Sequence, residues 1–518
     1  MTIPKGTTMS TPLSTDALTT TNGPRAGLRE WGALVVLMLP VLLVSVDNTV
    51  LNFALPAISE ALRPTGVQLL WMIDVYPLVL AGLLVPMGSL GDRFGRRRLL
   101  LIGATGFGIV SALAAFAPDV SALIAARALL GVFGAMLMPS TLSLLRSVFV
   151  DREQRRLAIA VWASGFAGGS ALGPIVGGIL LEHFWWGSVF LLAVPVLVPL
   201  VILVPLLVPE SRDPAPGPID PISIVLSLTT MLPIVYAIKS VASHGFAVDS
   251  VVGVVIGLAS GFAFVRRQLR ASTPMLDMSL FRRGSFSGAV GVNLLSVTAF
   301  VGGLFFVSQH LQLVLGMSPL DAGLVLVPGL VVMIASGLLV VPIAKRVRPS
   351  IVIPVGLSIS AVAYALVAVS GGQLTAVALA LIFMGLGLGI GAAETVSNEL
   401  IIATAPAEKA GAASAVSETA YELGAVLGTA VLGTILTASY RANVALPASL
   451  TDAQSAAAGE TLGGAVSVAE QVPAEVGEAL LASARDAFDS GVGVAAWIGS
   501  ALIVAAMVVA RTTLRKAR

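Results

Sequence analysis

The chain has 518 residues, of which 56% are hydrophobic and only 11% are charged, with a mean hydropathy of +0.96 and a formal net charge of +2. A soluble domain carries about 25% charged residues, so a soluble fold could not bury this much apolar surface. The chain has no cysteine, which excludes disulfides and thiolate metal sites, and its three scattered histidines argue against a structural zinc site. Because lipid offers the backbone no hydrogen-bond partners, we predict an all-α membrane protein.

The first segment, 1–30, is rich in Thr, Ser, Gly and Pro. We expect it to be a disordered cytoplasmic N-terminus. The apolar run that follows is about 24 residues long and lacks a short core followed by a small-residue cleavage site. It is therefore expected to stay in the membrane as a span and not to act as a signal peptide.

Fourteen apolar runs are long enough to cross a bilayer, which takes roughly 20 helical residues. In chain order they are 32–55, 68–90, 99–117, 121–145, 157–181, 187–208, 221–243, 249–265, 286–313, 320–344, 351–370, 373–403, 411–438 and 491–510. They divide as six, two and six, which predicts two six-helix halves and an inserted helical hairpin. The expected divisions are 31–209 for the first half, 210–270 for the hairpin, 271–438 for the first five helices of the second half, 439–490 for an extracellular loop, and 491–518 for the last span with its cytoplasmic tail.

The distribution of basic residues predicts the orientation of these spans. If the N-terminus is cytoplasmic, 25 of the 30 Lys and Arg residues fall in cytoplasmic segments. Three lie outside (Arg63, Arg441 and Arg485) and two lie within spans (Arg127 and Lys239). Because Lys and Arg accumulate on the cytoplasmic side, we predict a multi-pass protein of a bacterial inner (plasma) membrane with both termini in the cytoplasm.

The one long outer loop, 439–490, carries seven acidic and two basic residues, a net charge of −5. We expect a solvated cap that is helical in part after Pro473. The alternative is an acidic outer surface that modulates the release of cations.

The loop between the second and third spans reads GSLGDRFGRRR, residues 88–98. It resembles the loop signature of the major facilitator superfamily through Gly88, Leu90, Asp92, Arg93, Gly95, Arg96 and Arg97. Asp92 could pair with cytoplasmic arginines and cap a neighbouring helix, so we expect the loop to latch one conformation of the transporter. A simple positive anchor on the cytoplasmic face would explain the arginines but not the spacing of Gly and Asp.

The fifth span contains small residues at four-residue spacing, which allow helices to approach closely, and a proline that removes a backbone donor. These residues are Gly165, Gly169, Gly173, Pro174, Gly177 and Gly178. The pattern resembles the antiporter signature of the drug exporters in the same superfamily. In the fourth span, Arg127 followed by Gly131 and Gly134 resembles the superfamily's R-x3-G motif.

The first span ends in VDNTVLNFALP, residues 46–56, which resembles the first-helix motif of the fourteen-span drug/proton antiporter family. The segments 71–78, 318–323 and 417–424 extend this resemblance over essentially the whole chain, towards the family's multidrug and quaternary-ammonium exporters. It implies a proton-coupled antiporter with no cofactor other than the proton gradient. One departure is that AKRVRPS, after the tenth span, keeps only the positive charges of the loop signature.

Five acidic residues fall within predicted spans, where an unpaired charge is costly and so indicates function. They are Asp47, Asp74, Glu394, Glu418 and Glu422. Asp47 and Asp74 are each expected roughly 10 Å below the outer boundary and could share one cavity wall. Trp71 and Tyr76 would add aromatic faces that attract an organic cation.

Glu418 and Glu422 are four residues apart on one helix face, with Tyr421 beside them. Because two such carboxylates repel at low dielectric, we expect one of them to hold a proton that an arriving cation displaces. The family resemblance links acids of the first and thirteenth spans, here Asp47, Glu418 and Glu422, to substrate recognition and coupling. Arg127 should face the interior and take part in coupling, because its buried charge needs a partner.

A structural role, without part in transport, is an alternative for some of the acids. Asp74 could be a structural partner of a hydroxyl or backbone group, and Glu394 lies near the cytoplasmic end of its span. Asp321 follows Ser318 with the spacing of a helix capping box.

We therefore predict export of lipophilic organic cations, such as quaternary ammonium compounds, cationic dyes and multiple drugs, in exchange for protons. The alternative on the same fold is a uniporter or symporter for another small solute. Motifs for ATP hydrolysis or proteolysis are absent from the sequence, which argues against an enzyme. The expected partners are lipophilic cations, protons and the lipid bilayer; we expect no metal site, no nucleic acid and a monomer.

Overall fold

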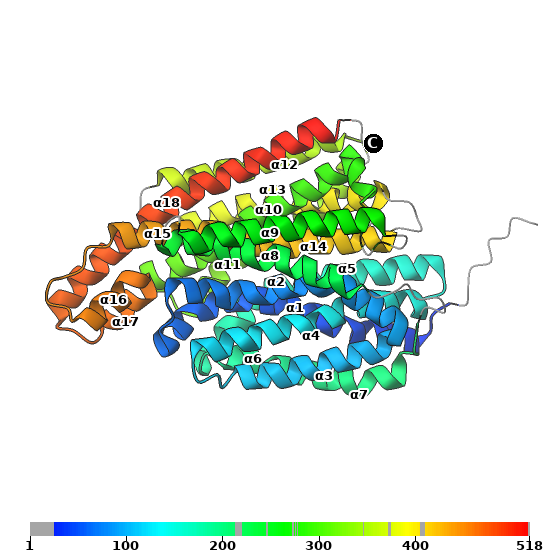
Figure 1. Cartoon of the computed structure of the whole chain (residues 1–518), viewed down its shortest axis with the longest axis horizontal. Coiled ribbons are helices and arrows are strands. Elements are labelled where there is room, and N and C mark those ends of the chain that lie inside the picture. The colour runs from blue at the N-terminus through cyan, green and yellow to red at the C-terminus, as the bar shows by residue number, and fades with distance from the viewer. Residues whose placement is uncertain are drawn as a thin grey trace, which may run out of the picture.

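The computed structural model describes residues 25–212, 220–244, 247–271, 274, 276, 278–344, 346–370, 374–404 and 410–515. Most of the predicted N-terminal segment, residues 1–24, and the link 213–219 before the hairpin lie outside the described residues. Figure 1 shows two stacked helix bundles, with the first half of the chain in one and the second half in the other.

Long helices form both bundles. The first half consists of α1 (Leu28–Leu62), α2 (Gly66–Phe94), α3 (Arg96–Ala114), α4 (Val120–Val148), α5 (Arg152–His183), α6 (Ser188–Leu191) and α7 (Ala193–Leu207). The hairpin consists of α8 (Pro221–His244) and α9 (Val248–Arg270). The second half consists of η1 (Leu280–Arg282), α10 (Gly284–Gln309), η2 (His310–Val314), α11 (Pro319–Ala344), α12 (Pro349–Val369), α13 (Ala376–Thr404), α14 (Ala410–Gly428), η4 (Thr429–Gly433), α15 (Thr434–Asn443), α16 (Asp452–Glu460), α17 (Leu462–Ala469) and α18 (Ala474–Thr513).

The predicted number of spans agrees with these helices. Thirteen helical stretches within the described residues are long and apolar enough to cross a membrane. The helix α5, 32 residues long and apolar over Leu172–His183, supplies the remaining predicted span. The expected all-α membrane fold is thus confirmed. Two spans contain π-helical turns, η2 after α10 and η4 after α14, and such turns are often found at functional sites.

The outer segment is helical after Pro473, as expected, but this helix and the predicted span from 491 are one element. The helix α18 runs without interruption from Ala474 to Thr513. The helices α16 and α17 precede it and form a cap that projects from one end of the molecule (Figure 1). The apolar period of the span alone gave no sign that the helix continues beyond the lipid.

The cap is attached to both halves of the molecule. The Glu460 carboxylate accepts a hydrogen bond of 3.2 Å from the backbone N–H of Gly66, the first residue of α2. The same carboxylate pairs with Arg441 of α15. These contacts close the bundle at the end that carries α16 and α17.

The inserted hairpin packs where the two halves meet. Leu78 of α2, Val235 of α8 and Val426 of α14 form a small buried apolar cluster with Ala430 of η4. At the start of the hairpin, Asp220 accepts hydrogen bonds from Arg267 at 2.8 to 3.1 Å. These bonds join the two ends of the hairpin. They also lower the pKa of the Asp220 carboxyl well below its usual range.

Small residues let α5 touch both halves. A Cβ added to Gly173 would lie 1.8 Å from Oγ1 of Thr49 on α1, and one added to Gly178 would lie 2.5 Å from the Cα of Leu320 on α11. Gly323 of α11 in turn leaves room for the backbone carbonyl of Pro174. The glycine pattern of the fifth span therefore sets the packing of α5 against α1 and α11.

Substitution of Gly173 by alanine should destabilise the protein, because Cβ of Thr49 would also lie 2.9 Å from the new methyl group. Overpacking of this kind costs about 1 to 3 kcal/mol. The matched control is Gly168→Ala on the same helix, where nothing lies within 4 Å of the new Cβ. Thermal melting in detergent, followed by size-exclusion chromatography, measures both. Equal melting temperatures for the two variants would contradict close α1–α5 packing.

Candidate functional site

A buried ion pair lies at the centre of the first half. Nη1 of Arg127 on α4 donates to Oδ2 of Asp47 on α1 at 2.6 Å, and its Nε donates to the backbone carbonyl of Met72 on α2 at 3.2 Å. The Arg127 side chain is 2% exposed and that of Asp47 is 10% exposed. Burying one charge alone is costly, so each side chain supplies the opposite charge that the other needs. Arg127 lies in the interior of the bundle, as predicted.

Tyr76 completes this group. The guanidinium carbon of Arg127 lies 4.5 Å from the centroid of the Tyr76 ring, a cation–π contact. Tyr76 is fully buried, and its hydroxyl has no hydrogen-bond partner among the described residues. Its ring thus contacts Arg127. We expected Tyr76 to line the substrate site, but it does not line the central cavity described below.

The acids of α14 lie across from this pair. Glu422 is buried, with 2% exposure, and the Asn48 side chain on α1, next to Asp47 in sequence, forms a hydrogen bond with its carboxylate. The charges of Asp47 and Glu418 both act on Glu422, which places the three carboxylates in one electrostatic network. The network therefore contains acids from both halves.

Tyr421 extends the network to α13. The charges of Glu394 and Glu422 both act on its hydroxyl. Glu394 and Glu418 are half-buried. Within the described residues, no Lys or Arg forms an ion pair with Glu394, Glu418 or Glu422. The three glutamates of the second half thus differ from Asp47, which has a permanent cation beside it.

Asp74 has a different environment. Its carboxylate accepts a hydrogen bond from the hydroxyl of Thr429, the first residue of the π-helical turn η4. The two residues are 355 positions apart and belong to opposite halves. The alternative interpretation of Asp74 was a structural bond to a hydroxyl or backbone group, and Thr429 supplies such a hydroxyl. The bond joins α2 to the second half at the depth of the acidic network.

A small cavity lies between these groups. Its lining includes Asn48 and Asn52 of α1, Asp74 of α2, Arg127 of α4, Phe300 of α10 and Tyr421 of α14. Its volume is about 40 Å³, enough for about one water molecule, whereas sites for small organic ligands occupy roughly 300 to 1,000 Å³. Trp71, expected at this site, does not line it. The conformation is therefore closed at this cavity, and a bulky ligand can enter it only after the halves move.

The signature loop after α2 makes contacts within the first half. Asp92 pairs with Arg96 at 2.8 Å, and Arg96 also donates to Oγ of Ser211 at 3.1 Å. The backbone N–H of Arg97 donates to Glu210 at 3.0 Å. Gly95 has a φ of +109°, a conformation that favours glycine, and its missing Cβ leaves room for the Glu210 carboxylate.

These contacts hold the loop to the segment that follows α7. The remaining signature residues are Gly88, Leu90 and Arg93, which all lie in α2, with Arg93 in its last turn. Residues 405–409, before α14, lie outside the described part of the chain. The latch between halves therefore stays a prediction.

Several site residues were not predicted. Asn48 and Thr429 contact two of the five acids, and Phe300 lines the cavity and stacks on Phe383 at 5.5 Å. Asn48 directly follows Asp47 in the first-helix motif, and that polar pair within an apolar span was a usable signal. Thr429 gave none, because a threonine in a helix commonly bonds only to its own backbone.

The family model of the major facilitator superfamily matches residues 37–429. The chain belongs to the major facilitator superfamily. The predicted recognition is thus confirmed, and this superfamily member is a multi-pass membrane transporter and not an enzyme. Its loop signature, its glycine-rich α5 and its Arg127 all lie within the matched region.

Curated relatives cover nearly the whole transporter. It is 58% identical to the multidrug efflux pump LfrA of Mycolicibacterium smegmatis over 95% of this chain and 98% of that protein. It is 38% identical to the methyl viologen resistance protein SmvA of Salmonella typhimurium, over 89% of this chain and 93% of that protein. The tetracenomycin C resistance and export protein of Streptomyces glaucescens is 33% identical over 98% of this chain and 96% of that protein.

A solved structure shares the fold. A bacterial homologue of the human lysosomal transporter Spinster, crystallised in an inward-facing and unoccupied conformation, superposes with a TM-score of 0.67. The alignment covers 95% of this chain and 99% of that chain at 16% identity. At this identity the likeness supports the fold of the transporter alone.

Removal of one partner of the central ion pair should be more harmful than removal of both. Arg127→Gln leaves the Asp47 carboxylate buried without its cation, which costs about 3 to 5 kcal/mol. The double variant Asp47→Asn/Arg127→Gln should regain part of the lost melting temperature. Thermal melts of the two single variants and the double variant in detergent test this coupling. Additive losses would show that the two side chains do not stabilise each other.

Proposed function

We propose that the chain is a proton-coupled antiporter that exports lipophilic organic cations, including quaternary ammonium compounds and cationic dyes, across the bacterial plasma membrane. Both termini face the cytoplasm in this proposal, as the distribution of basic residues predicts. The observation that carries the proposal is the network of buried carboxylates from both halves, beside a small cavity lined by Asp74, Arg127 and Tyr421. The names of the relatives, a multidrug efflux pump and a methyl viologen resistance protein, support drug export by this chain.

The environments of the five acids suggest a division of labour. Glu394, Glu418 and Glu422 have no basic partner within the described residues, so each must bind either a proton or a guest cation when it is buried. A proton and a cation that compete for the same carboxylates can cross only in opposite directions. Asp47 is neutralised by Arg127, so we assign the pair to coupling and the three glutamates to exchange.

The coupling follows from geometry. Asn48 reaches Glu422 from α1, beside the residue that pairs with Arg127. A guest cation that displaces a proton from Glu422 would disturb this link between α1 and α14. The Thr429–Asp74 bond joins the halves at the same depth, so the charge state of the network can be transmitted to their relative position.

Export of a dye tests this proposal. Energised cells that express the protein should exclude ethidium, and a protonophore should abolish exclusion because the proton gradient drives the exchange. Asp47→Asn and Glu422→Gln should each reduce ethidium efflux to the level of cells without the protein. The control Glu399→Gln alters an exposed acid of α13 outside the cavity and should retain efflux. Ethidium efflux that survives the protonophore would contradict proton coupling and favour a uniporter.

The number of carboxylates predicts a dependence on substrate charge. A dication such as methyl viologen can engage Glu418 and Glu422 together, whereas the monocation ethidium needs only one of them. Glu418→Gln should therefore impair efflux of methyl viologen more strongly than efflux of ethidium. Transport into inverted vesicles, compared at equal protein abundance, measures both rates. Equal losses for the two substrates would count against paired recognition.

A further inference from the structure

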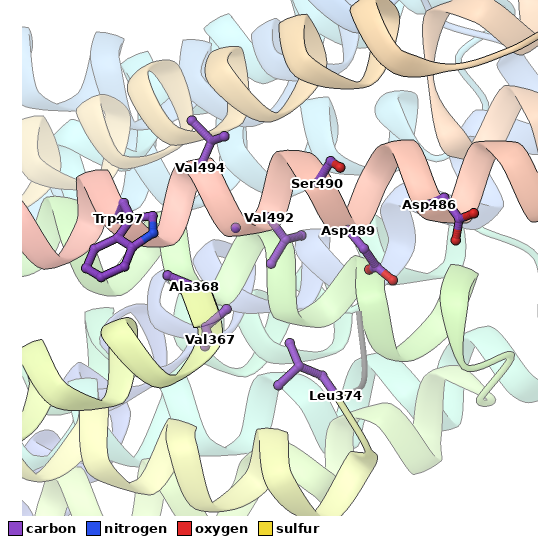
Figure 2. A pocket seen from close by; sticks show the side chains of 10 residues that line it. Val367, Ala368, Leu374, Asp486, Asp489, Ser490, Val492, Val494 and Trp497 are labelled. Atoms are coloured by element: carbon purple, nitrogen blue, oxygen red, sulfur yellow. The ribbon is translucent and has the colours of Figure 1, made fainter. Parts of the chain in front are cut away.

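A second cavity lies far from the central network in the fold. It is bounded by the last turns of α12, by Leu374 before α13 and by the middle of α18 (Figure 2). Its volume is about 560 Å³, within the range of roughly 300 to 1,000 Å³ typical of sites for small organic ligands. The cavity lies towards the end of the bundle that carries the α16–α17 cap, because α12 ends there and α18 descends from it (Figure 1).

The lining combines negative charge with apolar and aromatic surface. It consists of Val367, Ala368, Leu374, Asp486, Asp489, Ser490, Val492, Gly493, Val494 and Trp497. Of these described lining residues, two are carboxylates and none is basic. A cavity of this composition should repel anions and attract cations that carry apolar groups.

A buried histidine fixes one of the carboxylates. Nδ1 of His310 lies 3.0 Å from Oδ1 of Asp489, and its Nε2 lies 3.4 Å from the backbone carbonyl of Leu374. His310 is 1% exposed and begins the π-helical turn η2, which follows α10. The ring thus lies between Asp489 of α18 and the segment before α13. Asp486, one turn earlier on α18, is exposed.

The aromatic group lies at the other end of the cavity. Trp497 is eight residues after Asp489 on α18, a rise of about 12 Å. Figure 2 shows the Trp497 ring and the Asp489 carboxylate on the side of α18 that faces Val367 and Leu374. Trp497 is 54% exposed and Val494 is 47% exposed. Because α18 spans the membrane here, this side of the cavity can open towards lipid.

We propose that this cavity is a second binding site for lipophilic organic monocations, in which Asp486 and Asp489 neutralise the charge and Trp497 contacts the apolar substituents. A cation whose charge is delocalised is weakly hydrated, so it enters an apolar site at little cost. An aromatic face stabilises it further. The site shares no lining residue with the central cavity. Its position on the releasing side of the membrane rests on the proposed function, whereas binding itself does not.

The experiment measures binding of tetraphenylphosphonium to the purified full-length protein by equilibrium dialysis. The background variant Asp47→Asn/Glu422→Gln weakens the central network, and substitutions in the second cavity then show how much of the remaining binding belongs to that cavity. In this background, Asp486→Asn, Asp489→Asn and Trp497→Ala should each raise the Kd about fivefold, as expected for a partly exposed charge pair or cation–π contact. The matched control Glu478→Gln removes an exposed acid of α18 outside the cavity and should leave the Kd unchanged.

Two results would overturn the proposal. One is the absence of tetraphenylphosphonium binding by the background variant when its melting temperature matches that of the unaltered protein. The other is binding that all three cavity substitutions leave unchanged. Melting temperatures of the cavity variants separate loss of binding from loss of folding. Retained binding together with absent dye export would contradict the proposed function alone and leave the second site in place.

Discussion

The buried pair of Arg127 and Asp47 is the interaction on which the rest of the central site depends. A guanidinium within an apolar bundle must be neutralised, and Asp47, the Met72 carbonyl and the Tyr76 ring together achieve this. These contacts fix α1, α2 and α4 relative to one another. Once Asp47 is satisfied in this way, the cost of burying negative charge falls on the acids of the second half, which have no such partner.

Contacts between the halves include a small set of polar links beside the apolar cluster of Leu78, Val235, Val426 and Ala430. Thr429 bonds to Asp74, Asn48 bonds to Glu422, and the cap carboxylate bonds to the first residue of α2. The glycine contacts of α5 with α1 and α11 supply the complementary surface, on which backbones touch closely.

The two cavities lie in different parts of the bundle. The central one is closed to about the size of a water molecule and is lined by Asp74 and Arg127 of the first half and by Phe300 and Tyr421 of the second. The other lies within the second half, beside the cap, and combines two acids with an indole and aliphatic side chains. A cation that leaves the centre towards the cap would meet negative charge again, in a site with access to lipid. The acidic segment before the last span, which the sequence marked by charge alone, thus gains a definite place in the fold.

The sequence by itself determined the helical membrane class, the six, two and six arrangement of spans, the superfamily and the identity of the buried acids, because each depends on local hydropathy or short motifs. Tertiary structure alone decided the partners. Asp47 lies 80 positions from Arg127, and Asp74 lies 355 from Thr429, so only packing could bring them together. Likewise, no periodicity reveals that His310 lies beside Asp489, because hydropathy records burial in lipid and not contact between distant helices.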